Sequence, residues 1–161
     1  MTNASALQRE LKQSKPFRSL EQEALLSIER TAALLSHGVA DALRPYDITP
    51  TQYNVLRILR GAGEQGLCRN DVRDRLVAQV PDVTRLLDRM EQMELVERER
   101  ATDDRRMVFT RITKKGTQLL ARLDEPVARL HHQQLGHLGA TRLRTLIDLL
   151  AATRRVDDGE D

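Results

Sequence analysis

The order of apolar and polar residues predicts a mainly helical chain that begins with one long helix. Between residues 17 and 45, apolar side chains recur every three, four or seven positions, as on one face of an amphipathic helix, and Pro45 marks the end. A helix of about 27 residues is about 40 Å long. That is long for a chain of 161 residues, and part of its apolar face is expected to need a partner chain.

Shorter elements are predicted after this helix. Thr49 and Pro50 form a helix-start signal, because threonine caps the first turn and proline lacks the N–H group that would stay unpaired there. The glycines within residues 61–63 end this helix. A short strand at residues 67–68 and a second short helix over residues 70–76 are expected next.

The third short helix has a clear two-faced pattern. Pro81 is expected to open it, and its apolar positions share one side: Val83, Leu86, Leu87, Met90 and Met93. Two strands follow, over residues 95–100 and 107–112, and the turn over residues 101–104 is expected to be a longer loop because it has no glycine. Three short helices and a two-stranded hairpin are typical of a winged helix-turn-helix, here residues 46–113.

Helices are also predicted beyond the hairpin. Thr113 is an expected N-cap, and apolar residues continue at helical spacing toward residue 155. The predicted fold class is therefore mainly α with a small β-hairpin: a winged helix-turn-helix flanked by long N- and C-terminal dimerisation helices, residues 17–45 and 114–155. Residues 1–16 and 156–161 are polar or acidic and are expected to be disordered tails.

The composition narrows the classes of function. Aromatic residues make up 2% of the chain, which disfavours the stacking platforms that bind single-stranded nucleic acid. The formal net charge is only +2, and a positive surface therefore has to be local. A single cysteine excludes an internal disulfide, and the sequence has neither an apolar leader segment nor a run of ~18 apolar residues. We expect a cytoplasmic protein without a membrane partner.

A polar helix face beside a hairpin with an arginine-rich tip suits double-stranded DNA, because the helix fits the major groove and the tip reaches the neighbouring minor groove. Arg106 is expected to enter a narrow minor groove while Asp104 holds its guanidinium. The candidate DNA-binding residues are Pro81, Asp82, Thr84, Arg85, Arg89, Asp104, Arg105, Arg106 and Lys114.

Two alternatives to direct DNA contact stay open. The tip can be a solvated loop whose opposite charges balance. On the helix, Arg85 and Arg89 can pair with the nearby Asp82 and Asp88 instead of with DNA. Asp82 itself should be repelled by phosphates, and it can either act on the helix dipole or accept from a cytosine amine.

Other chemistry finds little support. Cys68 lies at an expected N-cap position, and a structural role is favoured over a redox role because no second cysteine exists. His131, His132 and His137 have no cysteine or carboxylate at a ligand spacing beside them, so no metal is expected. The sequence has no nucleophile elbow, glycine-rich phosphate loop or catalytic carboxylate pair, so neither an enzyme nor a cofactor is expected.

With these residues in hand, the chain resembles the MarR family of bacterial regulators from Phe17 to Arg155. The segments that carry the resemblance are ITPTQYNVLRIL, VTRLLDRMEQMELVERE, TDDRR and TRITKKG. The family typically has a VTRLVDRLE-like helix, a D-x-R-D-R-R-like wing and LT-x-x-G. By position, Asp104 and Arg106 match the wing's aspartate and its groove-inserting arginine. Ala101 and Asp103 depart from the wing pattern and weaken its positive charge.

The resemblance implies an obligate homodimer with interlocked terminal helices, which represses or sometimes activates nearby genes. Its twofold symmetry would present two recognition helices to a palindromic operator. In many relatives a small aromatic acid or another anionic ligand binds between the dimer helices and the winged helix and releases the DNA. In the redox branch the sensing cysteine lies in the first helix, whereas Cys68 lies outside it.

An anionic aromatic effector would need a pocket with basic and aromatic side chains. The candidates on or near the first two helices are His37, Arg44, Tyr46, Tyr53 and Arg57, and a structural role for each is an equal alternative. The leading prediction is a dimeric, sequence-specific transcriptional regulator, most simply a repressor. The alternative is a winged-helix module for protein interaction that has no specific DNA binding.

Overall fold

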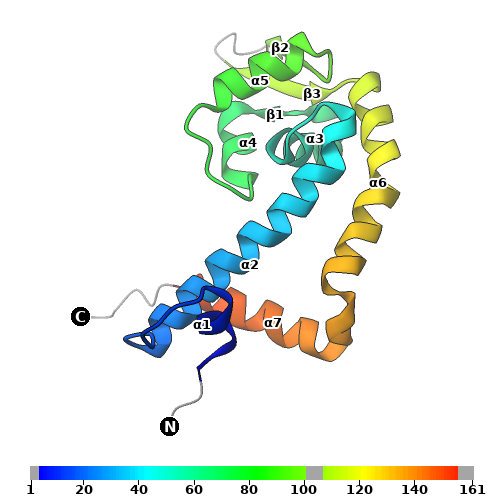
Figure 1. Cartoon of the computed structure of the whole chain (residues 1–161). Helices are drawn as coiled ribbons and strands as arrows, with labels where there is room; N and C mark the ends of the chain where they lie inside the picture. The colour runs from blue at the N-terminus through cyan, green and yellow to red at the C-terminus, as the bar shows by residue number, and fades with distance from the viewer. Residues whose placement is uncertain (1–3, 101–106, 156–161) are drawn as a thin grey trace, which may run out of the picture.

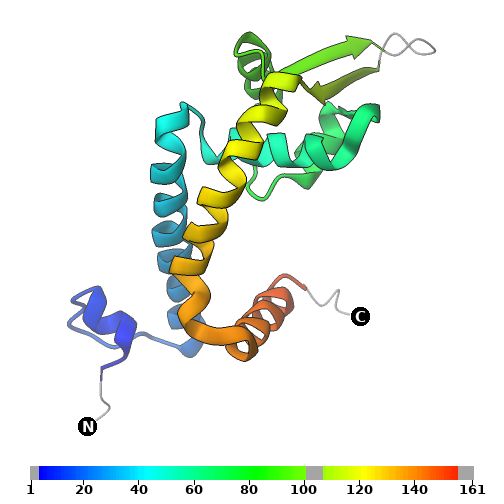
Figure 2. The ribbon, with the colours of Figure 1, turned by 90° about the vertical axis from the view of Figure 1, so that its right-hand side faces the viewer.

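A computed structural model of the chain describes residues 4–100 and 107–155. Two long helices, α2 (Leu20–Leu43) and α6 (Lys114–Leu135), run down from a head made of the shorter elements (Figure 1). The two helices are in contact, and the side-chain amide of Gln134 donates to the Leu35 carbonyl at 3.1 Å. This arrangement is seen from the side in Figure 2.

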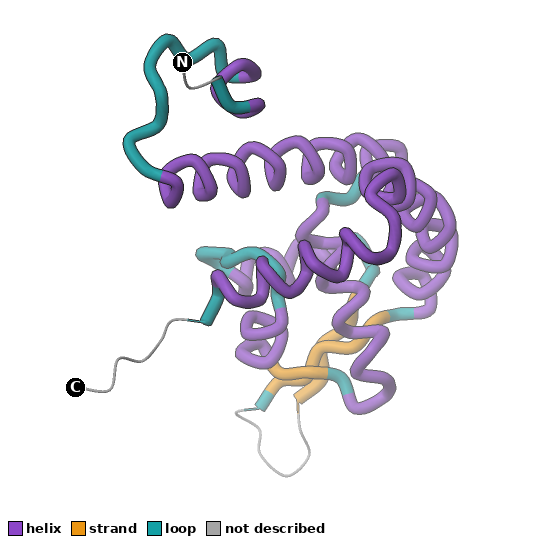
Figure 3. Tube along the Cα trace, turned by 90° about the horizontal axis from the view of Figure 1, so that it is seen from below, coloured by secondary structure: helices purple, strands orange, loops and turns teal. Residues whose placement is uncertain are grey.

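The other terminal helices lie at the far end of these two. Helix α7 (Gly139–Thr153) follows the 3₁₀ turn η3 (Gly136–Leu138) and turns away from the end of α6. Viewed from below, α7 is separate from α2 rather than packed along it (Figure 3). Helix α1 (Ala6–Glu10) precedes α2, and Leu7 is buried. This helix corrects the disordered tail predicted for residues 1–16, because Ser5 caps it and Leu7 has an apolar surface to cover.

The head contains the predicted winged helix-turn-helix. Its elements are η1 (Arg44–Tyr46), α3 (Pro50–Ala62), η2 (Gly63–Gln65), β1 (Leu67–Cys68), α4 (Arg69–Arg75), α5 (Val83–Gln92), β2 (Val96–Arg100) and β3 (Val108–Ile112). The predicted start of α3 is confirmed by a reciprocal cap. The Gln52 backbone N–H donates to the Thr49 hydroxyl at 3.2 Å, and the Thr49 N–H donates to the Gln52 side chain at 2.8 Å.

The predicted start of the third short helix is wrong by two residues. Helix α5 begins at Val83 because the Asp82 carboxylate accepts from the Arg85 N–H at 2.9 Å and thus occupies the N-cap position. Pro81 therefore lies in the loop before the helix. The predicted segregation of apolar residues is confirmed: Val83, Leu87 and Met90 are buried, while Leu86 and Met93 are partly buried against the core.

The sheet joins the predicted short strand at residues 67–68, which is confirmed, to the two strands of the predicted hairpin. Its order is β1-β3-β2, and both pairings are antiparallel. Leu67 lies opposite Thr110, which places the start of α4 next to the wing strands. Strand β3 begins at Val108 rather than at residue 107, and the predicted turn over residues 101–104 lies outside the described residues.

The core of the head is closed by the first half of α6. Leu119, Leu120, Leu123 and Val127 are buried in the same cluster as the apolar residues of α3 and α5. Across the same junction, the Arg60 guanidinium donates to both carboxylate oxygens of Asp124, at 2.7 and 2.9 Å. This fork holds α3 to α6 and lowers the pKa of Asp124 below its ordinary value.

The terminal helices, by contrast, leave large apolar side chains in solvent. Within α2, Leu43 is the one buried residue, with less than a tenth of its surface exposed. Every residue of α7 is at least partly exposed. The exposed side chains include Leu20, Leu25, Ile28 and Leu34 on α2 and Ile147 and Leu149 on α7. None of the helices in the described part of the chain has the length and apolar character that a membrane span requires.

Candidate nucleic-acid interface

Helix α5 presents a polar face to solvent on the side opposite to its buried residues. Thr84, Arg85 and Arg89 are exposed, and the Arg85 side chain keeps 88% of its accessible surface. Because Val83, Leu87 and Met90 anchor the opposite side in the core, the polar face has a fixed orientation. A rigid helix with exposed donors near its N-terminus has the geometry of an element that enters a major groove.

Among the described residues, one of the two helix arginines pairs within the molecule. Arg85 Nε lies 3.2 Å from Asp82 Oδ2, so Asp82 is at once the helix cap and the partner of Arg85. Asp88 pairs with Arg98 instead, at 2.7 Å. An exposed ion pair contributes at most about 1 kcal/mol, which leaves Arg85 able to exchange its partner for a ligand.

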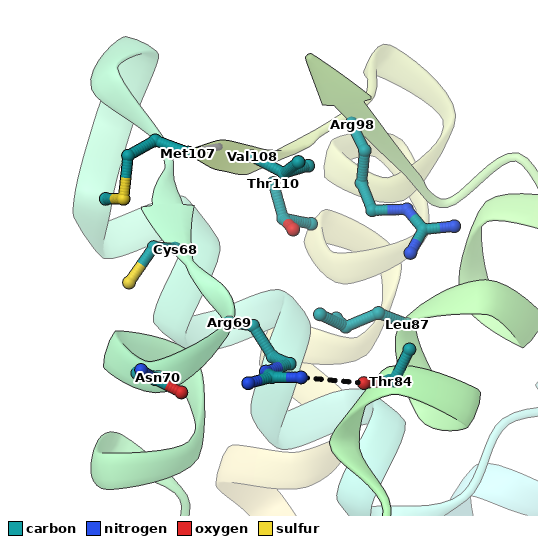
Figure 4. Close-up of a pocket in the computed structure, with 9 residues that line it drawn as sticks. All are labelled: Cys68, Arg69, Asn70, Thr84, Leu87, Arg98, Met107, Val108 and Thr110. Carbon is teal, nitrogen blue, oxygen red and sulfur yellow. Dashed lines mark hydrogen bonds between the residues drawn. The ribbon is translucent and has the colours of Figure 1, made fainter. Parts of the chain in front are cut away.

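The N-terminus of α4 lies beside α5 and adds two residues that the sequence did not single out. Arg69 Nη1 donates to the Thr84 hydroxyl at 3.4 Å, and the exposed Asn70 follows it (Figure 4). Together with Arg98 they line a hollow of about 360 Å³ between α4, α5 and the wing strands. The only signal in the sequence for these two residues was the presence of a basic and an amide residue at a helix start. Their nearness to α5 could not be seen there, because it depends on the pairing of β1 with β3.

A cluster of opposite charges joins α5 to strand β2. Arg98 contacts Asp88 and Glu91, and its hydrogen bond to Glu91 raises the pKa of the guanidinium and lowers the pKa of the Glu91 carboxyl. The Glu91 carboxyl therefore stays ionised at neutral pH and paired with Arg98, which also contacts Asp88 at 2.7 Å. The single positive charge of Arg98 offsets one of the two negative charges of Asp88 and Glu91, which limits their repulsion of an approaching anion.

The remaining predicted DNA contacts are placed as follows. Asp104, Arg105 and Arg106 lie outside the described residues, and their role stays a prediction. Lys114 is the first residue of α6 and is exposed, whereas the neighbouring Lys115 pairs with Glu94 at 2.9 Å.

The five predicted effector residues are distributed over several environments. His37 Nδ1 lies 2.9 Å from one oxygen of Asp41, and Arg44 pairs with the other oxygen. Tyr53 is buried in the core, with the Arg57 guanidinium 6.0 Å from its ring centre. Arg44 lines a hollow of about 450 Å³ and Tyr46 lines a separate one of about 320 Å³.

Cys68 occupies the predicted N-cap position of α4. Its Sγ accepts from the Asp71 N–H at 3.5 Å, and the thiol lies 3.1 Å from the Asp71 carboxylate, to which it donates. These contacts agree with a structural role. His131 and His132 lie on α6 and His137 lies in η3, and within the described ranges no group of three metal-ligating side chains is found.

Sequence comparison identifies the family to which this geometry belongs. The sequence model of the MarR family matches residues 48–108, which include α3, α4, α5 and β2. The HTH-type transcriptional regulator MhqR of Bacillus subtilis (strain 168) is 30% identical over 101 residues, which are 58% of this chain and 68% of that protein. The chain belongs to the MarR family.

Solved structures of MarR proteins have the same fold. The MarR transcription factor from Planctomyces limnophilus is 39% identical, with a TM-score of 0.65 over 84% of this chain and 98% of that one. A mutant MarR from E. coli in complex with operator DNA is 25% identical, with a TM-score of 0.75 over 94% of this chain and all, 100%, of that one. The winged helix-turn-helix predicted for the MarR-family chain is therefore confirmed, and the relatives are named as transcriptional regulators.

Proposed function

We propose that this MarR-family regulator binds double-stranded DNA as a homodimer, with α5 as its recognition helix, and represses the genes beside its operator. The observation that carries the proposal is the exposed polar face of α5, with Thr84, Arg85 and Arg89 held in place by buried residues behind them. The likeness to an E. coli MarR solved with operator DNA supports binding to double-stranded DNA. Lys114 and the loop residue Pro81 are assigned to phosphate or flanking contacts.

The dimer is part of this proposal. Residues 17–45 and 114–155 are assigned to dimerisation and residues 46–113 to DNA binding. The reason is that α2 and α7 expose large apolar side chains, whereas the apolar residues of the head are buried in one core with part of α6. Twofold symmetry would pair two α5 helices with a palindromic site. Analytical ultracentrifugation at micromolar concentration tests this assignment, and a folded, stable monomer would contradict it.

Release from DNA by a small anionic aromatic ligand is a second part of the proposal. Two hollows next to the predicted residues combine cationic and apolar side chains. One contains Arg44 and Arg89, and the other contains Tyr46, Lys115 and Arg122. Their volumes, about 450 and 320 Å³, are in the range of ~300–1,000 Å³ that small-molecule sites occupy. We propose no enzymatic activity for the protein. We propose that it is located in the cytoplasm, where a regulator can bind the chromosome.

The test uses a duplex that the wild-type protein itself enriches from a random 30-base-pair library, compared with a scrambled duplex of the same composition. Arg85→Ala should lower the affinity for the enriched duplex by about 1–3 kcal/mol and the affinity for the scrambled one by less, because a base contact is lost. Lys114→Ala is the matched control, and it should weaken both affinities alike and flatten their dependence on salt.

The outcomes separate the two candidate functions. An equal loss for both duplexes in Arg85→Ala would show that α5 does not read bases. Failure of the wild-type protein to enrich any sequence, with weak binding to duplex at low salt, would favour the module for protein interaction instead.

A further inference from the structure

Strand β2 carries one arginine whose side chain leaves the sheet and reaches helix α5. Arg98 lies at the middle of the strand, opposite Thr110 of β3. Its Nη2 is 2.7 Å from Asp88 Oδ1 and 2.5 Å from Glu91 Oε2, and its Nε donates to the same Glu91 oxygen at 3.0 Å. One planar group thereby holds two carboxylates that lie on successive turns of α5.

This contact differs from the exposed ion pairs around it. The Arg98 side chain is 26% exposed, against 88% for Arg85, so its hydrogen bonds are less open to competition from water. A guanidinium that donates through several N–H groups also resists rotation better than a single point contact does. The Arg98 bridge is thus suited to hold two elements at a defined angle.

The connection between the two elements shows why such a bridge has an effect. Only Met93, Glu94 and Leu95 lie between α5 and β2, and Glu94 adopts a positive φ of 59°. The Leu95 N–H donates to the Met90 carbonyl at 2.9 Å, which secures the start of the strand. Farther along β2, the Arg98 side chain contacts α5 again. The short turn and Arg98 therefore restrain the wing strands at two separate points.

We propose that Arg98 is a positioning residue that sets the direction of the wing strands β2 and β3 relative to α5, and thereby the preference of the protein for its operator over other DNA. The inference rests on the proposed function, in which α5 enters the major groove. Two elements that contact one duplex at the same time bind best when their relative geometry exists before binding. Loss of the bridge should therefore reduce specific binding more than general attraction to phosphate.

A simpler effect of charge has to be separated from positioning. Without Arg98, the carboxylates of Asp88 and Glu91 would repel any DNA. The experiment therefore compares Arg98→Met with the triple variant Arg98→Met, Asp88→Asn, Glu91→Gln, which removes the bridge together with both negative charges. Affinities for the duplex enriched by the wild-type protein and for a scrambled duplex are measured by fluorescence anisotropy.

Arg111→Met is the matched control. Arg111 lies on β3, its side chain is 30% exposed, and its Nη1 is 2.5 Å from Glu99 Oε2, so this variant also removes a half-buried bridging arginine of the sheet. Its partners are Glu99 and the Glu64 carbonyl, and neither belongs to α5. The ratio of specific to general affinity should stay within about twofold of the wild-type value in this control.

Arg98→Met is expected to lower that ratio by about tenfold or more. In the triple variant the affinity for the scrambled duplex should return to the wild-type level or above, while the lowered ratio persists. Recovery of the ratio in the triple variant would show that charge alone matters and would overturn the proposal. An unchanged ratio in Arg98→Met would do the same.

A further variant covers the case in which the Met substitutions prevent folding, as judged by circular dichroism and thermal melting. Arg98→Lys keeps the charge but replaces the planar fork with one ammonium group. Its ratio should fall by an intermediate factor of about threefold to fivefold. A wild-type ratio in Arg98→Lys would contradict the positioning role, whereas failure of the wild-type protein to enrich a duplex would count against the proposed function instead.

Discussion

A side chain at Gly116 is expected to weaken the packing of α6 against the head. A Cβ atom at this position would lie 2.3 Å from the Leu95 carbonyl oxygen, 2.9 Å from Ile112 Cγ1 and 3.3 Å from Leu56 Cδ2. An ordinary carbon–oxygen contact is about 3.3–3.6 Å, so the first of these is short by about 1 Å. The Leu95 oxygen cannot move freely, because it belongs to the backbone and accepts from the Thr113 N–H at 3.1 Å.

The magnitude follows from two opposing effects of Gly116→Ala. Alanine gains about 1 kcal/mol over glycine in a helix interior. Overpacking of a core costs about 1–3 kcal/mol and occasionally more, and here the obstacle is rigid backbone. Gly116→Ala should therefore lower the free energy of unfolding by about 2 kcal/mol, with the upper part of the overpacking range outweighing the helical gain.

Gly61→Ala is the matched control on α3, since a Cβ atom at Gly61 would have no neighbour within 4 Å among the described residues. It should raise the free energy of unfolding by up to about 1 kcal/mol. Urea unfolding at one fixed protomer concentration measures both variants, and at about 2 kcal/mol per molar urea their midpoints should differ by about 1–1.5 M. A midpoint for Gly116→Ala at or above the wild-type value would refute the packing argument.

Two further predictions concern single contacts. Asp124→Asn should cost less than about 1 kcal/mol at pH 7, because its pair with Arg60 is half-exposed. Because the pKa of Asp124 is lowered in the folded protein, the pair stabilises the fold fully above the unfolded carboxyl pKa of about 3.9. The difference in thermal stability between the wild-type protein and Asp124→Asn should therefore vanish as the pH falls through the lowered pKa. A difference that persists in acid would contradict this. Thr49→Ala removes the cap of α3 and should lower the free energy of unfolding in urea by about 1 kcal/mol. Thr51→Ala, inside the same helix, should change it by less than about 0.5 kcal/mol. Equal effects of the two variants would argue against capping.

The sequence determined the local elements, because their signals depend on neighbours a few residues apart. The capping residues Thr49 and Thr113 marked helix starts, and the spacing of Val83, Leu87 and Met90 identified the buried side of α5. The remaining side of the helix, which carries Arg85, could then be identified as the exposed face. In each case the hydrogen bond or the helical period lies within one or two turns of chain, where spacing alone specifies geometry.

The tertiary structure decided which distant residues meet. The sequence offered Asp88 as a partner for Arg89, but the fold pairs Asp88 with Arg98, because β2 turns back along α5. Likewise the pairing of Leu67 with Thr110 brings Arg69 next to Thr84, and Arg60 meets Asp124 only where α6 packs on α3. A carboxylate lies within a few residues of each of these arginines in the sequence, such as Glu64 for Arg60 and Asp71 for Arg69. The partner that each arginine takes depends instead on how the backbone is placed over tens of residues. The burial of the shared apolar core sets that placement, and no local spacing specifies it.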